Sequence, residues 1–336
     1  MSPVFLVWLE LAACIALIGL AGPELSRSGD VIAAKTRLSA SWIGLVLLAA
    51  VTSLPELITG ISSVTIADAP EIAVGDIFGS CVFNLAILAV LDLVSRRVPF
   101  YGRVSESHVL SAGFGVLLIG VAGMNLLIPH RPGFSIGHIG FYTPVILALY
   151  AVAMRSIFSY EKRRAVELAE DIADRYPQIT LRSAILRYAG ASVIVVAAGV
   201  WLPFIGADLA EAMGWQRSFV GTLFVAGATS TPEAVVTLAA LRLGAVDMAV
   251  ASLLGSNLFD MAILAVDDIF FRRGPLLSAV SSVHAISAFS AIIMTGLTII
   301  GVLYRPKKLL FQSAGWVSIA LLLMYLMNSY LLFQSG

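Results

Sequence analysis

The sequence predicts an all-α integral membrane protein with ten transmembrane helices, arranged as two inverted five-helix repeats. Two observations carry this prediction: ten long apolar segments, and a pair of motifs that recurs about half a chain apart. Of the 336 residues, 59% are hydrophobic and only 12% are charged, and the mean hydropathy is +0.94. Such a chain is too apolar for a soluble core.

Ten segments are long enough to cross the hydrocarbon layer, which takes about 20 residues of helix. They are Val4–Gly22, Ser41–Ile66, Ile72–Val94, Val109–Ile128, Gly137–Ile157, Ser183–Phe204, Phe219–Leu241, Met248–Ile269, Val280–Val302 and Ala314–Phe333. Met1–Pro3 carries no basic residue, and the first apolar run lacks a clear small-residue cleavage site. We therefore expect that run to be a retained helix rather than a signal peptide.

The connections between these segments predict the orientation in the membrane. If the N-terminus is outside, the inner connections hold seventeen of the 21 Lys and Arg residues, and the outer connections hold Arg131, Arg217, Arg272 and Arg273. Basic residues concentrate on the cytoplasmic side, so both termini are expected outside.

Three domains are expected along the chain. Residues 1–157 form the first half, 158–182 a cytoplasmic connector that we expect to be a short amphipathic helix, and 183–336 the second half.

Two pairs of motifs repeat along the chain. Pro55-Glu56 recurs 177 residues later as Pro232-Glu233, and "GSCVFNLAIL" from Gly79 recurs 176 residues later as "GSNLFDMAIL" from Gly255. About five spans, an odd number, separate the copies, so the second copy enters the membrane from the opposite side. Inverted repeats of this kind, about 47–90 and 224–266 here, are typical of secondary transporters.

Each Pro-Glu pair places a helix breaker beside a carboxylate inside an apolar span. Proline donates no N–H and disturbs the preceding turn, which frees backbone carbonyls around Val51 and Ala228. Thr52 and Glu56 are four residues apart, as are Thr229 and Glu233, so hydroxyl and carboxylate share a helix face. Carbonyl, hydroxyl and carboxylate oxygens are the ligands of hard cations such as Ca²⁺ and Na⁺.

The third and eighth predicted spans each carry a polar stripe with a spacing of four residues. The stripes are Asp76, Ser80 and Asn84, and Ser252, Ser256 and Asp260. Gly75, Gly79 and Gly255 beside them would allow close backbone approach. Asp76 is a conditional member of the site, because its position is nearer the membrane surface and water.

Carboxylates at membrane depth are costly, by roughly 2.5–3.5 kcal/mol each, and normally pair or serve function. No Lys or Arg lies in the spans that hold Glu56, Glu233 and Asp260. These acids are therefore either protonated or paired with a mobile cation. Cys14 and Cys81 form neither a disulfide framework nor a zinc site. The four histidines, at span ends or in loops without metal-binding spacing, are interpreted as incidental.

The motifs "TSLPE…GDIFGSCVFN" and "TSTPE…GSNLFD" resemble the two α-repeats of the prokaryotic sodium/calcium exchangers, a branch of the cation/Ca²⁺ exchanger superfamily. The resemblance implies that fold, with Glu56 and Glu233 as Ca²⁺ ligands and Asn84 and Asp260 alongside. It also implies Na⁺ and Ca²⁺ positions lined by Thr52, Ser53, Thr229, Ser230, Ser80 and Ser256. The chain departs from the family pattern at Val51 and Ala228, where glycine is usual, at Thr231, which replaces leucine, and at Asp76 and Ser252, where asparagine is common.

The function implied by the resemblance is secondary-active exchange of Ca²⁺ for Na⁺ across the cell membrane by alternating access, without enzymatic activity. Expected partners are lipid, Ca²⁺ and Na⁺, with no organic cofactor and no nucleic acid, and a monomer is the simplest expectation. Proton-coupled exchange of Ca²⁺ or another divalent ion stays open, because a desolvated carboxyl group can load protons near neutral pH. An intramembrane protease using Asp76 and Asp260 is a remote alternative, since "VGDIFG" faintly resembles such an enzyme.

Overall fold

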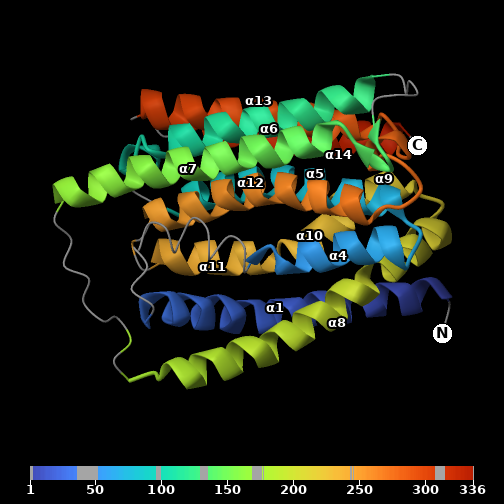
Figure 1. Cartoon of the computed structure of the whole chain (residues 1–336), viewed down its shortest axis with the longest axis horizontal. Helices are drawn as coiled ribbons and strands as arrows, with labels where there is room; N and C mark the ends of the chain where they lie inside the picture. Colours follow the sequence, from blue (N-terminus) through green and yellow to red (C-terminus); the bar gives the residue numbers. More distant parts are fainter. Residues whose placement is uncertain are drawn as a thin grey trace.

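Two helices, α5 (Pro70–Val94) and α12 (Val246–Phe270), lie at the centre of a helical bundle in the computed structural model (Figure 1). The structure describes residues 3–35, 52–95, 100–128, 135–168, 176, 178–242, 244, 246–306 and 315–335. The other long helices are α1 (Pro3–Lys35), α6 (His108–Leu127), α7 (Tyr142–Leu168), α8 (Leu181–Met213), α13 (His284–Tyr304) and α14 (Trp316–Gln334). The shorter elements are α4 (Leu54–Thr65), η2 (Tyr101–Arg103), β1 (Ser135–Ile136), β2 (Ile139–Gly140), α9 (Arg217–Val220), η3 (Gly221–Val225), α10 (Ala226–Thr229), α11 (Thr231–Arg242) and η4 (Leu276–Ser278).

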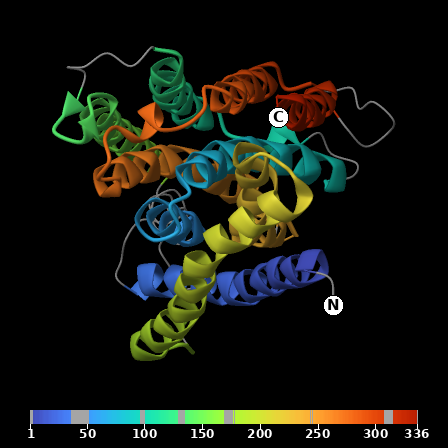
Figure 2. The same cartoon turned by 90° about the vertical axis from the view of Figure 1, so that its right-hand side faces the viewer.

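The bundle is layered around the central pair. Figures 1 and 2 show α6, α7, α13 and α14 on one side of α5 and α12, and α4, α10 and α11 on the other, with α1 and α8 beyond them. The main apolar core joins α5 and α12 to the first group of helices. A second apolar cluster joins α1 and α8 to the region around η3, through residues such as Cys14, Leu202 and Val225. The α1 and α8 layer is thus packed on the rest of the bundle through an apolar cluster that is distinct from the main core.

Within the described residues, eight helices are long and apolar enough to span a membrane, and the bent segment Arg217–Arg242 makes a ninth. These nine correspond to nine of the ten predicted spans. The remaining span, Ser41–Ile66, falls partly outside the described residues, and α4 is its second part. The two marked chain ends lie at the same end of the bundle, as an even number of crossings requires (Figures 1 and 2). The predicted fold class is confirmed.

Two predicted boundaries differ from the structure. The span expected from Gly137 begins as a helix only at Tyr142, because β1 and β2 form an antiparallel hairpin whose turn holds Gly137 at φ +67°. Residues 158–168 of the connector are helical as expected, but they continue α7 and do not begin a helix of their own. Their helix-forming residues leave no break after the apolar part. Residues 169–175 and 177 lie outside the described part of the chain.

Candidate ion-binding site

The two Pro-Glu motifs interrupt their helices in the same way. Ser53 precedes α4 with φ −84° and ψ 14°, and Ser230 lies between α10 and α11 with φ −80° and ψ 9°. In the second copy the helix bends by 46° at this point. Proline cannot donate to the preceding turn, which explains why both breaks fall just before Pro55 and Pro232. Of the carbonyls expected to be freed, that of Val51 lies outside the described residues.

Each break places a glutamate in the first turn of a buried helix, and the two glutamates are held by equivalent bonds. Glu56 and Glu233 are each 1% exposed. The Ser230 hydroxyl donates to Oε1 of Glu56 at 3.2 Å, and the Ser53 hydroxyl donates to Oε1 of Glu233 at 3.2 Å. The serine of each motif therefore binds the glutamate of the other repeat.

The polar stripes of α5 and α12 complete the same arrangement. Ser80 donates to Oε1 of Glu56 and Ser256 donates to Oε1 of Glu233, both at 3.4 Å. The Ser230 and Ser80 hydroxyl oxygens lie 3.0 Å apart, within hydrogen-bonding distance. Oε1 of each glutamate thus accepts one bond from the serine stripe of its own repeat and one from the interrupted helix of the other repeat.

The residues four positions after these serines also pair across the repeats. Asn84 donates from Nδ2 to Oδ1 of Asn257 at 3.0 Å, and the Cys81 thiol lies 3.7 Å from Oδ2 of Asp260. Asn257 in turn donates to the Cys81 carbonyl at 3.2 Å. Since Cys81 and Asn257 occupy equivalent places in the two repeats, these contacts obey the same internal symmetry. The site predicted from the sequence did not include Asn257 and Cys81, although their 176-residue spacing could have identified them as equivalent positions.

The threonines and Asp76 lie in the same buried region. Thr229 donates to Oδ1 of Asp76 at 2.8 Å, and the Thr52 hydroxyl hydrogen-bonds to Glu233. Asp76 is 0% exposed, so the protein shields it from water, although its position near the end of the predicted span indicated contact with water. All eleven predicted residues are therefore buried, and the contacts above join them in one region. Ser252, at the place equivalent to Asp76, is buried as well.

Oxygen atoms without partners mark the centre of this region. Among the described residues, Oε2 of Glu56 and of Glu233, Oδ2 of Asp76 and Oδ1 of Asp260 accept no hydrogen bond, and neither does Oδ1 of Asn84. The Ser252 hydroxyl is also unpartnered. Buried polar atoms are normally satisfied, and unpaired buried carboxylates are especially costly. Within the described part of the chain, none of these acids pairs with Lys or Arg. A cation is the partner that this oxygen set fits.

The carboxylates alone do not form a preassembled metal centre. No three His, Cys, Asp or Glu side chains in the described residues converge closely enough for one. Hydroxyl and amide oxygens of Ser, Thr and Asn lie between the acids instead. A set of mixed carboxylate, hydroxyl and amide oxygens is suited to binding a hard cation.

Glycine packing brings the interrupted helix against α5. A Cβ on Gly79 would lie 2.4 Å from the Thr222 carbonyl oxygen, and one on Gly75 would lie 3.0 Å from the Thr222 nitrogen. This confirms the close approach expected at these two glycines. The facing segment, η3, is a π-helical turn, a wider turn that is frequent at functional sites.

Two pairs of a buried histidine and a more exposed acid, which the sequence analysis overlooked, connect the ends of helices. His284 contacts Oε2 of Glu71 at 2.7 Å, and His108 contacts Oδ1 of Asp247 at 3.1 Å. Glu71 and Asp247, like the two histidines, are 176 residues apart, so these pairs also repeat. The interpretation of His108 and His284 as incidental was wrong. Extending the repeat search to "SESH" and "SSVH" could have found them.

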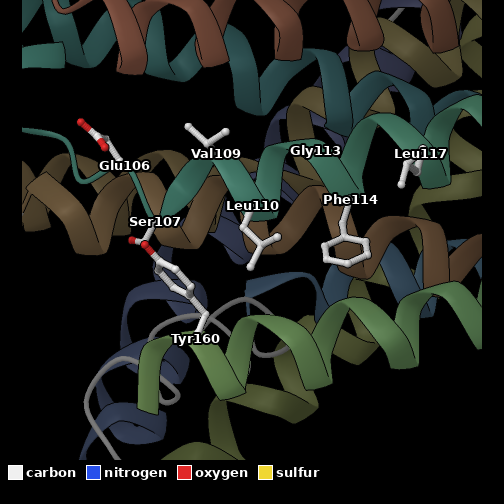
Figure 3. Close-up of a pocket in the computed structure, with 8 residues that line it drawn as sticks. All are labelled: Glu106, Ser107, Val109, Leu110, Gly113, Phe114, Leu117 and Tyr160. Atoms are coloured by element: carbon white, nitrogen blue, oxygen red, sulfur yellow. The ribbon is translucent and has the colours of Figure 1, made fainter. Parts of the chain in front are cut away.

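A cavity of about 620 Å³ between α6 and α7 is separate from this site. Figure 3 shows its apolar wall, formed by residues such as Leu110 and Phe114, with the Tyr160 side chain reaching from α7 toward Ser107. It contains none of the candidate ligands. Its mainly apolar lining suits contact with hydrocarbon rather than with ions.

Comparisons with known proteins agree with this geometry. Residues 6–158 and 183–334 match the family model described as sodium/calcium exchanger protein. The chain is 27% identical over 232 residues to the uncharacterized membrane protein MJ0091 of Methanocaldococcus jannaschii, covering 68% of this chain and 70% of that protein. It is 25% identical over 224 residues to the inner membrane protein YrbG of Escherichia coli K12, covering 66% of each.

Solved structures share the fold at lower sequence identity. The structure of native YfkE aligns with a TM-score of 0.68 at 18% identity, over 99% of this chain and 93% of that one. The sodium-calcium exchanger NCX_Mj, soaked with Na⁺ and Ca²⁺, aligns with a TM-score of 0.62 at 20% identity, over 96% and 97%. At these identities the likeness concerns the fold, which has the same helical architecture along nearly the whole chain.

Proposed function

Because the chain belongs to the sodium/calcium exchanger protein family, we propose that it is a secondary-active antiporter that exchanges Ca²⁺ for Na⁺ by alternating access. The protein is a cation exchanger of the membrane rather than an enzyme, which removes the intramembrane protease alternative. The observation that carries the proposal is the buried set of unpartnered oxygens on Glu56, Glu233, Asp260 and Asn84.

In this proposal the transported ions replace the missing hydrogen-bond partners. Glu56 and Glu233 ligate Ca²⁺ between the two interrupted helices, with Asn84 and Asp260 alongside. Thr52, Ser53, Thr229, Ser230, Ser80 and Ser256 supply hydroxyl and backbone oxygens to the Ca²⁺ and Na⁺ positions, and Asp76 belongs to the same set. One set of oxygens cannot satisfy Ca²⁺ and several Na⁺ ions at once, so competition between them couples the two fluxes.

Alternating access requires one part of the bundle to move against another. The α1 and α8 layer is the mobile element in this proposal, since it has a separate apolar cluster and lies outside α4 and α11. Bound cations neutralise the acids, and a partly filled, negatively charged site resists exposure to apolar surroundings. Ca²⁺ flux that requires no exchanged cation would contradict this coupling rule.

The remaining parts of the proposal concern orientation. The two five-helix halves, residues 1–157 and 183–336, flank the cytoplasmic connector 158–182 in a monomer of the plasma membrane, with both termini outside. Ca²⁺ then leaves the cytoplasm as Na⁺ enters.

The decisive test is uptake of radiolabelled Ca²⁺ into proteoliposomes loaded with Na⁺. We expect uptake to require an outward Na⁺ gradient, and Glu56→Gln or Glu233→Gln to abolish it, because each removes a charged ligand. Glu211→Gln, an exposed position on α8, is the matched control and should transport normally.

The same vesicles separate the alternatives. Uptake driven only by a proton gradient would assign the protein to proton-coupled exchange, since the acids pair with no Lys or Arg among the described residues and can carry protons instead. No Ca²⁺ movement under either gradient would contradict Ca²⁺ exchange altogether.

A further inference from the structure

A further buried acid, Asp267, lies outside the set described above. It follows Asp260 by seven residues on α12, so the two side chains share a helix face. Asp267 is 0% exposed, and in the described part of the chain neither of its carboxylate oxygens has a hydrogen-bond partner. Its neighbour Asp268, by contrast, accepts four hydrogen bonds, from Gly140, Tyr142, Thr143 and Leu276. Asp268 is therefore structural, whereas the role of Asp267 is unexplained by packing.

The carboxylate of Asp267 lies directly against α4 at Gly60. A Cβ at Gly60 would come within 2.2 Å of Oδ2 of Asp267, so only glycine leaves room for the acid. Gly60 follows Glu56 by four residues, and Thr59 and Ser63, four residues apart on one face of α4, lie to either side of it in the sequence. The hydroxyls of Thr59 and Ser63 are both 0% exposed and without a partner among the described residues. The carboxylate of Asp267 therefore lies against the part of α4 that carries these two unsatisfied hydroxyl groups.

The internal repeat supplies a built-in comparison, because the other half lacks this cluster. The residues equivalent to Asp267, Thr59 and Ser63 are Leu91, Val236 and Ala240, all apolar. Thr237, equivalent to Gly60, donates its hydroxyl to the Glu233 carbonyl at 2.6 Å and so is satisfied within its own helix. The polar cluster therefore exists on one side of the central site only.

The position of the cluster along the bundle is defined by the ends of α4 and α12. Both helices run from the central site toward the end where Asp68 and Arg273 form an ion pair, beyond Thr65 and Phe270. Asp267 therefore lies between the central acids and that end. A buried carboxylate with hydroxyl oxygens around it is a ligand set for a hard cation.

We propose that Asp267, Thr59 and Ser63 form a second cation station, occupied by Na⁺ or Ca²⁺ on its way between the central site and the α4–α12 end. The inference rests on the proposed exchange function. It makes the transporter asymmetric: ions entering from this end meet the station first, and ions entering from the other end meet apolar residues at the equivalent place.

The test compares Asp267→Asn, Thr59→Val with Ser63→Ala, and the control Thr237→Val. The paired substitution installs the residues of the other repeat, so it preserves shape and remains informative if Asp267→Asn fails to fold. Ca²⁺ uptake is measured in right-side-out and in inside-out membrane vesicles. We expect the KM for Ca²⁺ supplied at the α4–α12 end to rise about tenfold, and the KM at the opposite end to change less than about twofold. The control should match the unmodified protein at both ends.

A second measurement is independent of transport. Equilibrium binding of radiolabelled Na⁺ and Ca²⁺ to the purified protein should lose one bound cation in Asp267→Asn and retain it in Thr237→Val. Unchanged binding, or an equal KM change at both ends, would overturn the proposal, as would a change in pH dependence alone, which would assign a proton to Asp267. Absence of Na⁺-driven Ca²⁺ uptake by the unmodified protein would instead refute the exchange function, and the binding result would then decide the station separately.

Discussion

Ser53 and Ser230 illustrate how single residues connect the two halves. Each lies at a helix break and donates at 3.2 Å to the glutamate of the other repeat. Neither bond could form within one half alone. A serine in one repeat therefore positions the proposed cation ligand of the other, and a defect in either half affects both glutamates.

Removing one of these hydroxyls should weaken cation binding without abolishing it. A hydrogen bond to a charged group contributes about 1.5–3 kcal/mol, so we expect Ser53→Ala and Ser230→Ala each to raise the KM for Ca²⁺ about tenfold or more. Because the contacts are equivalent, the two effects should be of similar size. Concentration dependence of Na⁺-driven Ca²⁺ uptake measures both.

Ser192→Ala is a matched control for that comparison, since the Ser192 hydroxyl donates only to the Tyr188 carbonyl of its own helix, at 2.8 Å. A KM that stays unchanged in both Ser53→Ala and Ser230→Ala would show that these hydroxyls do not support the ligands.

At the scale of elements, Asp92 and Asp268 tie the ends of the two central helices to neighbouring segments. Asp268 accepts bonds from the residues that begin α7 and η4, and Asp92 accepts bonds from Gly315 at 2.9 Å and Ser318 at 2.6 Å, at the start of α14. These acids occupy equivalent positions in the two repeats but accept different numbers of hydrogen bonds. They hold the central helices in place around the candidate ion-binding site.

Substitution of these acids should lower stability in proportion to the donors left unpaired. Each buried donor without a partner costs about 1–3 kcal/mol, so Asp268→Ala should destabilise the protein by at least about 3 kcal/mol, and Asp92→Ala by roughly half as much. Thermal unfolding in detergent, monitored by size-exclusion chromatography, shows which of the two variants loses more stability. Asp208→Ala, at an exposed position on α8, should be neutral, and a larger loss in Asp92→Ala than in Asp268→Ala would contradict this account.

At the scale of the whole molecule, contacts between charged residues lie at both ends of the bundle. Arg217 and Arg273 both contact Asp68 at one end, and Arg305 pairs with Glu106 at 3.0 Å at the other. Hydrogen bonding from Arg273 lowers the pKa of the exposed Asp68 carboxyl group. Each of these contacts joins residues that were assigned to the same side of the membrane.

The orientation itself is open to a labelling experiment. If both termini are outside, a cysteine at Ser335→Cys should react with a membrane-impermeant maleimide in intact cells, whereas one at Arg242→Cys should react only after permeabilisation. Cys14 and Cys81 are buried and should stay unlabelled. Labelling of Arg242→Cys in intact cells, with Ser335→Cys labelled only after permeabilisation, would show that both termini lie inside. The outer and inner ends of the bundle would then be exchanged.

Much of this protein follows from the sequence, because the membrane restricts what a chain can do. Backbone groups in hydrocarbon must bond internally, so long apolar segments specify helices. The repeated Pro-Glu motifs predicted the breaks at Ser53 and Ser230, and the regular stripes on α5 and α12 predicted which side chains share a face. Local periodicity suffices for these features, since each depends on residues within a few turns of one another.

Tertiary structure decided which faces meet. The bonds from Ser53 to Glu233 and from Asn84 to Asn257, and the approach of Asp267 to Gly60, join residues far apart in the chain. The sequence shows two similar halves but not how they interdigitate, because that depends on packing of side-chain shapes across helices. For the same physical reason, the saturated bonding of Asp268 and the unpartnered oxygens of Asp267 became distinguishable only when the surrounding helices were in place.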